Sequence, residues 1–307
     1  MNVRPLPIEL EKLAKDELNE DPQLLAHGIQ HLKEWIAKQP HLRATTNDQW
    51  LAAFLRGCKH RIELAKKKID LYYTLRSIYP DMYALKHSDP KFLELFQLGI
   101  ALILPKRMKP TDPRVVLIRP GLLDPYKYDV MDFISLTIIH QMIAFMEDDV
   151  FLVAGTVNIF DLQGVGMAHL LQMTPVRIKK MILGGQDASP LRLKMAHFVN
   201  AHSGFESVFN IAKSMMNAKM RSRLMVHSNM ESLYECVPKE ILPVEYGGNR
   251  GSAQDITNDW TKKLKEYGPW LDEDLVYGTD EANRLGTPTV SQDIFGLEGS
   301  FRKLQFD

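Results

Sequence analysis

Short aliphatic runs alternate with helical segments between residues 100 and 227, and this alternation limits the fold more than any other feature of the chain. Strands are expected at Ile100–Leu104, Val115–Arg119, Phe151–Phe160, Leu191–Asn200 and Leu224–His227. Helices are expected at Tyr128–Glu147, Gly166–Met173, Pro175–Leu183 and Phe205–Arg223. Strands that alternate with helices predict an α/β sheet that contains parallel pairs.

The segments on either side of this region differ from it. Residues 9–80 have helical apolar spacing, and Asn47-Asp48 forms a capped start before an amphipathic stretch. Beyond Gly247-Gly248 the chain is acidic, with a helical pattern around Ile256–Tyr267. We therefore expect a small all-helical module at 1–90, an α/β domain at 91–250 with a mixed, largely parallel sheet, and a partly helical acidic tail at 251–307.

Charge is balanced overall but segregated along the chain. Lys and Arg together number 38, as do Asp and Glu, which argues against a strongly basic nucleic-acid binder. Seven basic residues face two acidic ones between Leu51 and Arg76, and nine face two between Arg177 and Arg223, whereas ten acids face four bases between Asp255 and Glu298. The question for function is whether the two basic blocks meet on one surface.

The sequence contains no recognisable catalytic template. Gly-x-Ser-x-Gly, a Walker A loop, His-Glu-x-x-His and Cys-x-x-Cys are all missing, so we predict a protein that is not an enzyme. His27 and His31 have the spacing of a metal clip, yet no third ligand is apparent, and solvated histidines are favoured. Cys58 and Cys236 are too few for a disulfide framework, which favours a reducing, cytoplasmic setting. No metal site and no cofactor is predicted.

Several ordered motifs resemble the CRAL-TRIO (Sec14-like) lipid-binding family. The stretch from Asp48 to Tyr73 has the Phe-Leu-Arg step and the Ala/Lys-rich helix of that family's N-terminal module. The lipid-binding signature is matched in order by Asn158–Gly164, His169 with Thr174-Pro175, Gln186–Arg192, His197–Asn200 with His227, and Ile241–Gly248. The resemblance spans about residues 10–265 and is strongest to the branch that contains alpha-tocopherol transfer protein and cellular retinaldehyde-binding protein.

The resemblance implies one hydrophobic cavity between a sheet floor and a mobile helical gate at about Phe205–Met216. After Lys213 the family's usual Pro-Phe-Leu is replaced by Ser214-Met215-Met216, which leaves open whether the gate hinges as in relatives. Ser135, Thr137 and His140 are candidate partners for a ligand head group, or satisfied polar residues on a buried helix. The full implied ligand-binding set is Phe133, Ser135, Thr137, His140, Ile159, Phe160, Leu183, Leu191, Phe198, Phe205, Phe209, Ala212, Met215 and Met216.

The same branch binds phosphoinositide phosphates in a basic groove beside the gate. Its basic positions correspond to Arg192, Lys194, Lys219 and Arg223, with Arg221 nearby. A fifth family arginine falls on Cys58, and the adjacent Lys59 is the candidate substitute. Polyanionic head groups need several converging cations, so these six residues are the predicted phosphoinositide-binding set.

The leading hypothesis is a cytoplasmic carrier, peripherally associated with membranes, for a tocopherol, retinoid, carotenoid or similar isoprenoid. It would exchange this lipid at phosphoinositide-containing membranes through the gate. The alternative is a lipid-sensing adaptor or phospholipid-binding regulator that acts through a protein partner, with the acidic tail as the contact. An enzyme that acts on the captured lipid is the third and weakest hypothesis. Nucleic acid is not expected as a partner.

Overall fold

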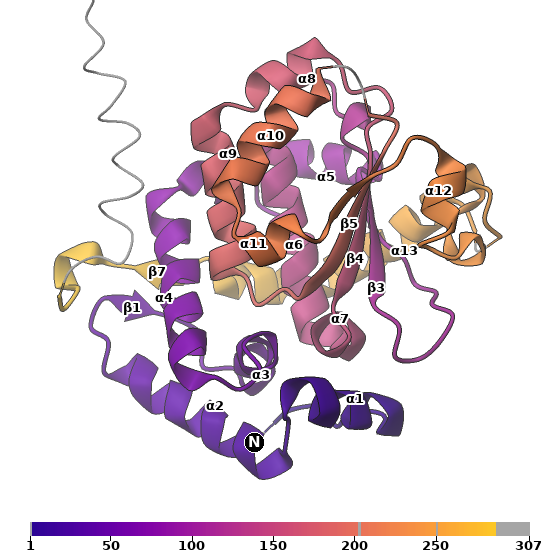
Figure 1. The fold of residues 1–307 in the computed structure, drawn as a ribbon. Helices are drawn as coiled ribbons and strands as arrows, with labels where there is room; N and C mark the ends of the chain where they lie inside the picture. Colours follow the sequence, from indigo (N-terminus) through magenta and orange to yellow (C-terminus); the bar gives the residue numbers. More distant parts are fainter. Residues whose placement is uncertain (1, 202–203, 250, 287–307) are drawn as a thin grey trace, which may run out of the picture.

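A five-stranded sheet forms the centre of the computed structural model, which describes residues 2–201, 204–249 and 251–286 (Figure 1). The strands are β2 (Ala101–Ile103), β3 (Arg114–Ile118), β4 (Thr156–Asp161), β5 (Leu193–Val199) and β6 (Leu224–Val226), in that spatial order. The β2–β3 pair is antiparallel, as expected for two strands joined by a turn, and the other pairs are parallel. The predicted α/β fold with a largely parallel sheet is confirmed.

Most connecting helices lie on one face of this sheet. These are α6 (Val130–Glu147), α8 (Met167–Gln172), α9 (Pro175–Ile182), α10 (Phe205–Met215) and α11 (Ala218–Arg221), with a π-helical turn at Leu183–Ala188 after α9 (Figure 1). Crossover connections between parallel strands are nearly always right-handed. When successive strands are added to the same edge of a sheet, the connecting helices therefore lie on the same face. The short α12 (Met230–Tyr234) lies on the opposite face.

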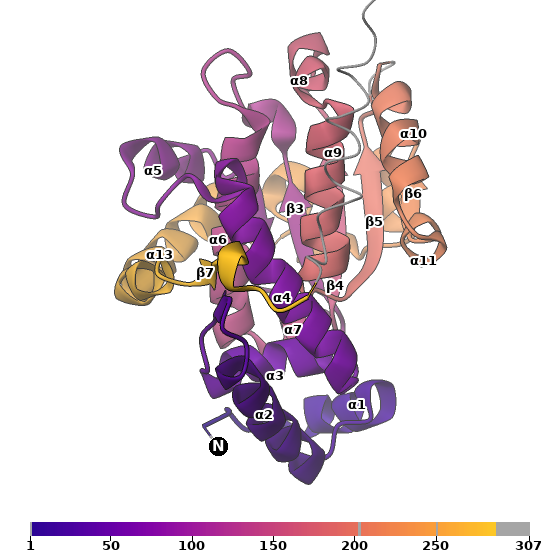
Figure 2. The same cartoon turned by 90° about the vertical axis from the view of Figure 1, so that its left-hand side faces the viewer.

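The helical module stands at one end of the sheet (Figure 2). Its helices are α1 (Ile8–Leu18), α2 (Pro22–Ala37), α3 (Asp48–Gly57) and α4 (Ile62–Ile78). Asn47 caps α3 by accepting a hydrogen bond from the Trp50 backbone, as the Asn47-Asp48 pattern predicts. One apolar core extends from Leu25 of α2 through the sheet region to Leu271, so the module is packed onto the α/β part.

A buried ion-pair network joins this module to α7 (Asp149–Val153). The Arg56 side chain is 1% exposed, and its Nη2 lies 2.9 Å from Glu20 Oε1 while its Nη1 lies 3.2 Å from Asp149 Oδ1. His60 Nε2 lies 3.2 Å from the other Glu20 oxygen, and Arg4 Nε lies 2.7 Å from Asp149. Arg56 is the arginine of the Phe-Leu-Arg step, so that motif supplies a structural clamp here.

Two predicted elements are divided in the structure. Phe151–Phe160 is not one strand, because Asp148 caps the short helix α7 and β4 begins only at Thr156. Gly155 turns the chain between them at a φ of +83°, where a Cβ atom would lie 2.3 Å from the Arg192 carbonyl oxygen. Phe205–Arg223 is not one helix either: Met216 is extended and Asn217 caps α11. The gate helix therefore ends at Met215 without a proline.

The first part of the predicted tail belongs to the folded body. Helix α13 (Ala253–Asp274) packs Trp260, Leu264 and Leu271 into the core and contacts β2 and α5 (Pro90–Gln97). Farther on, β7 (Gly278–Thr279) pairs with β1 (Leu42–Arg43) of the helical module. Residues 287–307 of the predicted tail lie outside the described residues. The 3-10 turns are Pro80–Tyr83, Pro120–Leu122, Lys239–Ile241, Val244–Tyr246 and Glu281–Asn283.

Among the described residues, α6 alone is long and apolar enough to cross a membrane by length and composition. Of its 18 residues, 67% are buried inside the fold, which is typical of the core helix of a globular domain. The predicted buried helix at Tyr128–Glu147 is thereby confirmed, with its start at Val130.

The Glu20 carboxylate makes the clamp sensitive to acid. Burial alone would raise the pKa of Glu20, but hydrogen bonds from His60 and Arg56 outweigh it and lower that pKa from 4.5 to about 2. A carboxyl with a lowered pKa stabilises the fold above its ordinary pKa, and this contribution is lost as the pH falls from about 4.5 towards 2.

We therefore predict that Glu20→Gln lowers the free energy of unfolding at pH 7 by on the order of 3 kcal/mol. The deficit relative to the unmodified chain should shrink as the pH falls below 4.5, which urea titrations at pH 7 and pH 3.5 would measure. Glu11→Gln on the exposed side of α1 is the control and should change neither value. An equal deficit at both pH values would contradict the assignment.

Candidate functional site

Four phenylalanine rings meet between α10 and the sheet. Phe160 of β4 and Phe198 of β5 are register partners, and their rings stack at 4.8 Å between centroids. Phe205 and Phe209, one helical turn apart on α10, lie 5.5 and 5.1 Å from the Phe198 ring and 5.0 Å from each other. The gate helix and the sheet floor that the sequence predicts are thus brought together, and we call these four residues the aromatic cluster.

The aromatic cluster is only half-buried although helices and sheet surround it. All four rings are of intermediate exposure, as are Val208, Ala212, Met215 and Met216 on the same helix. No side chain of α10 is fully buried. On the opposite side of the same two strands, by contrast, Ile159 is 1% exposed and Val199 is 0% exposed. One face of the sheet is closely packed, and the face under α10 leaves apolar surface accessible.

Other predicted ligand-binding residues lie at different places. Leu183 and Leu191 are half-buried against the main core, near the aromatic cluster's side of the sheet. Thr137 is half-buried on α6, where its hydroxyl donates to the Ile134 carbonyl at 2.8 Å. Phe133 is 9% exposed and belongs to the main core.

Ser135, His140 and Ile159 do not join the aromatic cluster. The Ser135 hydroxyl accepts a hydrogen bond from the Leu85 backbone at 3.1 Å. The His140 ring is stacked on Phe96 at 4.7 Å and lies 5.0 Å from Trp260, and its burial lowers its pKa to about 4. Ile159 points to the other face of the sheet. His140 Nδ1 lies 3.3 Å from the Leu136 carbonyl oxygen, and its enclosed Nε2 has no hydrogen-bond partner among the described residues. The sequence could not show this, because the packing of α6 against its neighbours decides where each of its polar groups lies.

Two polar groups that the sequence reasoning passed over lie in the floor instead. Thr156 and Asn158 have the same parity along β4 as Phe160, so their side chains share its face. Thr156 Oγ1 and Asn158 Oδ1 are both enclosed, and neither has a hydrogen-bond partner among the described residues. The asparagine within this strand was the available indication, since asparagine is depleted in strands.

Two pockets lie elsewhere in the described part of the chain. A space of about 40 Å³ beside Ser135, Ile139 and Leu271 is far below the roughly 300–1,000 Å³ of ligand sites. A cleft of about 340 Å³ is lined by polar groups that include Arg119, Asp161 and Glu245, which do not suit an apolar chain. Neither pocket offers the half-buried apolar surface that lies under α10.

The predicted basic residues converge beside α10. The charge of Arg223 lowers the pKa of Lys219 most, followed by burial and by the charges of Lys59, Arg61 and Arg192. Burial and the charge of Arg192 likewise lower the pKa of Arg223. Cations that perturb one another's pKa lie close together, so the two basic sequence blocks meet on one surface, which we call the basic patch (Lys59, Arg61, Arg192, Lys194, Lys219 and Arg223).

Glu17 of α1 occupies one side of the basic patch. Its Oε2 lies 2.7 Å from Arg192 Nη2 and 2.7 Å from Lys194 Nζ. Burial opposes ionisation of Glu17, but these two hydrogen bonds outweigh it and lower its pKa. A carboxylate from the helical module therefore sits between two cations of the α/β part, in the position that an anionic ligand oxygen would take.

Arg221 and Cys58 lie outside the basic patch. Arg221 turns back, and its Nη1 donates to the Met216 carbonyl at 2.6 Å. Cys58 is 0% exposed and burial raises its pKa to about 11, so it faces the core, whereas the adjacent Lys59 is exposed. Lys59, and not Cys58, can therefore present a side chain at the surface for the predicted phosphoinositide contact.

The sheet, its covering gate helix and the matches to family models define a lipid-binding protein. Residues 99–248 match the model described as CRAL/TRIO domain, and residues 21–91 match that described as Pinta-like, UBA domain. The chain belongs to the CRAL-TRIO family, whose members bind lipophilic ligands and transfer them.

Sequence relatives named for lipid transfer agree with this membership, and one solved structure also aligns. A human protein named alpha-tocopherol transfer protein-like is 31% identical over 250 residues, which cover 80% of this chain and 71% of the relative. Mouse Clavesin-2 is 27% identical over 280 residues, covering 90% of this chain and 84% of the relative. The crystal structure of Sfh5 aligns with a TM-score of 0.46 and 13% identity, over 86% of this chain and 100% of that chain.

The unpartnered Asn158 Oδ1 generates a prediction about the empty protein. Asn158→Leu removes an enclosed polar group and keeps a similar shape, so it should raise the free energy of unfolding by about 1 kcal/mol. Chemical denaturation of delipidated protein would measure this. Asn217→Ala, which removes the α11 cap, should lower stability instead. A loss of stability in Asn158→Leu would show that the amide has a partner.

Proposed function

We propose that this protein is an intracellular carrier that encloses one hydrophobic lipid between α10 and the floor of the sheet. The observation that carries the proposal is the half-buried aromatic cluster, since apolar surface between packed elements is what an apolar guest would cover. Burial of a long chain is favourable by about 0.8 kcal/mol per CH₂ group. Loading would therefore be tight, and release into water slow.

The polar atoms of the floor support a guest with a polar end. Thr156 Oγ1 and Asn158 Oδ1 are enclosed and have no partners within the described part of the chain. An apolar guest that carried one hydroxyl would satisfy both, by donating to Asn158 Oδ1 and accepting from the Thr156 hydroxyl. Tocopherols and retinoids combine a long apolar body with such a group, whereas a pure hydrocarbon carotenoid would leave it unpaired. Within the isoprenoid class, we therefore favour an oxygenated guest.

Slow release into water requires a membrane that receives the guest. The basic patch supports docking on anionic lipid, because each Lys or Arg near such a surface contributes about 1 kcal/mol. The patch lies beside α10, so docking that favoured an open position of α10 would shift its equilibrium towards release. Glu17 would compete with lipid phosphate for Arg192 and Lys194.

The adaptor hypothesis has less support. It uses the segment after Gly248 as a contact for a protein partner, but α13 places its apolar face in the core of the fold. An enzymatic role finds no support in the aromatic cluster or the basic patch, which offer no nucleophile beside a base. We therefore keep the non-enzymatic carrier as the proposed function.

The carrier proposal predicts the effect of a charge on the inner face of α10. Phe209→Asp should weaken the binding of retinol by about tenfold or more, because a carboxylate would face the apolar guest. The fluorescence of retinol itself would measure the binding. Asn210→Asp adds the same charge to the exposed side of the same helix and should leave binding unchanged. The proposed site would be contradicted if the two variants bound retinol with equal affinity and if tocopherol displaced retinol equally well from both.

The docking step predicts the effects of two opposite changes in the basic patch. The double variant Lys59→Glu and Lys219→Glu should reduce transfer of loaded lipid to vesicles containing phosphatidylinositol bisphosphate about tenfold or more. Glu17→Gln should increase it by freeing Arg192 and Lys194. The control is Lys262→Glu with Lys265→Glu on the exposed face of α13, which should transfer normally. Unchanged transfer by the patch variants would refute docking through this surface.

A further inference from the structure

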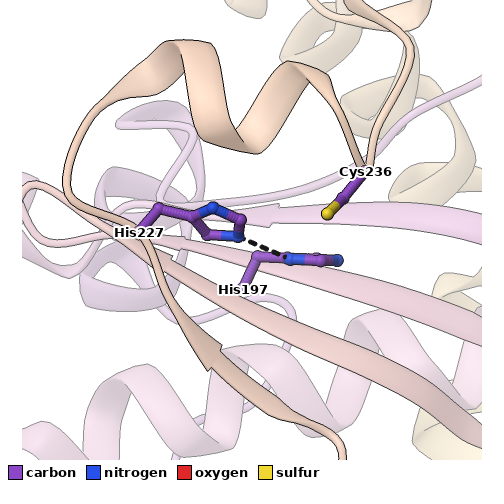
Figure 3. Close-up of side chains that lie close together, drawn as sticks. All are labelled: His197, His227 and Cys236. Carbon is purple, nitrogen blue, oxygen red and sulfur yellow. Dashed lines mark hydrogen bonds between the residues drawn. The ribbon is translucent and has the colours of Figure 1, made fainter.

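A cluster of nitrogen and sulfur groups lies on the face of the sheet opposite α10. Three members are His197 of β5, with His227 and Cys236 on either side of α12 (Figure 3). The fourth is Met225 of β6, whose sulfur lies near that of Cys236. One ligand atom from each of the two histidines and Cys236 lies within 4.8 Å of the others. His197 and Met225 are register partners, and His227 follows Met225 by two residues. The parallel pairing of β5 and β6 therefore places these three side chains together.

The two imidazoles already point ring nitrogens at one another. His197 Nδ1 lies 2.8 Å from His227 Nε2, and Figure 3 shows the Cys236 sulfur directed towards this pair. Two metal bonds of about 2.0 Å at a tetrahedral angle place their nitrogens about 3.3 Å apart. An ion would be admitted if side-chain rotations opened this pair by about half an ångström and brought the Cys236 sulfur, which lies within 4.8 Å of both nitrogens, to about 3.5 Å from them.

A serine fixes the tautomer of His227. The Ser232 hydroxyl donates to the Asn229 carbonyl at 2.9 Å, so it accepts at its oxygen from His227 Nδ1, which lies 3.1 Å away. With its proton on Nδ1, His227 presents the lone pair of Nε2 to His197. A histidine that donates its second N–H to a neighbouring oxygen is the arrangement seen around metal ligands.

Sulfur adds a preference for a soft ion. The Cys236 sulfur lies 3.8 Å from the Met225 thioether sulfur, and both side chains reach the surface, with Met225 39% exposed. Thiolate and thioether ligands select copper(I) over hard cations, and two histidines, one cysteine and a weak methionine form a known copper donor set. Exposure of the two sulfurs gives an ion access from solvent.

We propose that His197, His227 and Cys236, with Met225 as a weaker fourth ligand, form a binding site for one copper(I) ion. Binding would release the Cys236 thiol proton, because the thiolate is the ligand. His197 would move its ring proton to Nε2, and His227 would keep its own on Nδ1. The site lies on the face of the sheet away from the aromatic cluster, so it is separate from the lipid function.

The test is anaerobic titration of the full chain with copper(I) in competition with the chromophoric chelator bicinchoninate. One equivalent should bind, and Cys236→Ser should weaken binding by about 100-fold, since it replaces the exposed thiolate without disturbing the core. Met225→Leu should weaken it by a smaller factor, and Ser232→Ala by about tenfold. Cys58→Ala is the matched control, because it removes the other thiol and should leave binding unchanged.

Three results would overturn the proposal. These are binding that Cys236→Ser does not weaken, binding that Cys58→Ala abolishes, and a bound zinc ion that copper(I) does not displace. Retinol binding measured on the same samples keeps the two proposals distinct, because Cys236→Ser should leave it unchanged.

Discussion

Side-chain alternation along β4 and β5 is the constraint on which both proposed sites depend. Register pairs Phe160 with Phe198 on one face and Ile159 with His197 on the other. The first pair forms the floor under α10, and His197 faces α12 and its cysteine. A slip of one residue in either strand would exchange the two faces, placing imidazole in the apolar floor. Side-chain alternation thus places the proposed lipid floor and the nitrogen and sulfur cluster on opposite faces of one sheet.

The Arg56 clamp connects that sheet to the charge on its surface. Arg56 holds Glu20, which directly follows α1, and Asp149, which begins α7, so it fixes where α1 lies relative to the α/β part. Glu17 on the same helix then reaches Arg192 and Lys194 of the basic patch. Removing one partner of a buried ion pair typically costs about 3–5 kcal/mol, so this placement is firmly held. Opposite charges that lie far apart in the sequence thereby meet in one contact between the Glu17 carboxylate and the two cations.

Much of this structure could be predicted from residue patterns, and the failures have physical causes. The sheet, the buried α6 and the convergence of the basic residues followed from periodicity and from family resemblance. The break at Gly155 was missed because an apolar run does not distinguish a helical turn from a strand, and the end of α10 was missed because Asn217 caps α11 without a proline. Ser135 bonds to Leu85 and His140 packs against Phe96, both away from the floor. Asn158 and the His197 cluster depend on strand parity and pairing, which only three-dimensional register supplies.

The floor under α10 is proposed to hold one oxygenated isoprenoid. Native mass spectrometry of the protein purified from a eukaryotic cytosol, followed by organic extraction and identification of what is released, tests this most directly. We expect one lipid per chain, with a hydroxyl on an isoprenoid body, and no such lipid on the Phe209→Asp variant prepared in parallel. A chain that carries no lipid, or a phospholipid that Phe209→Asp retains, would contradict it.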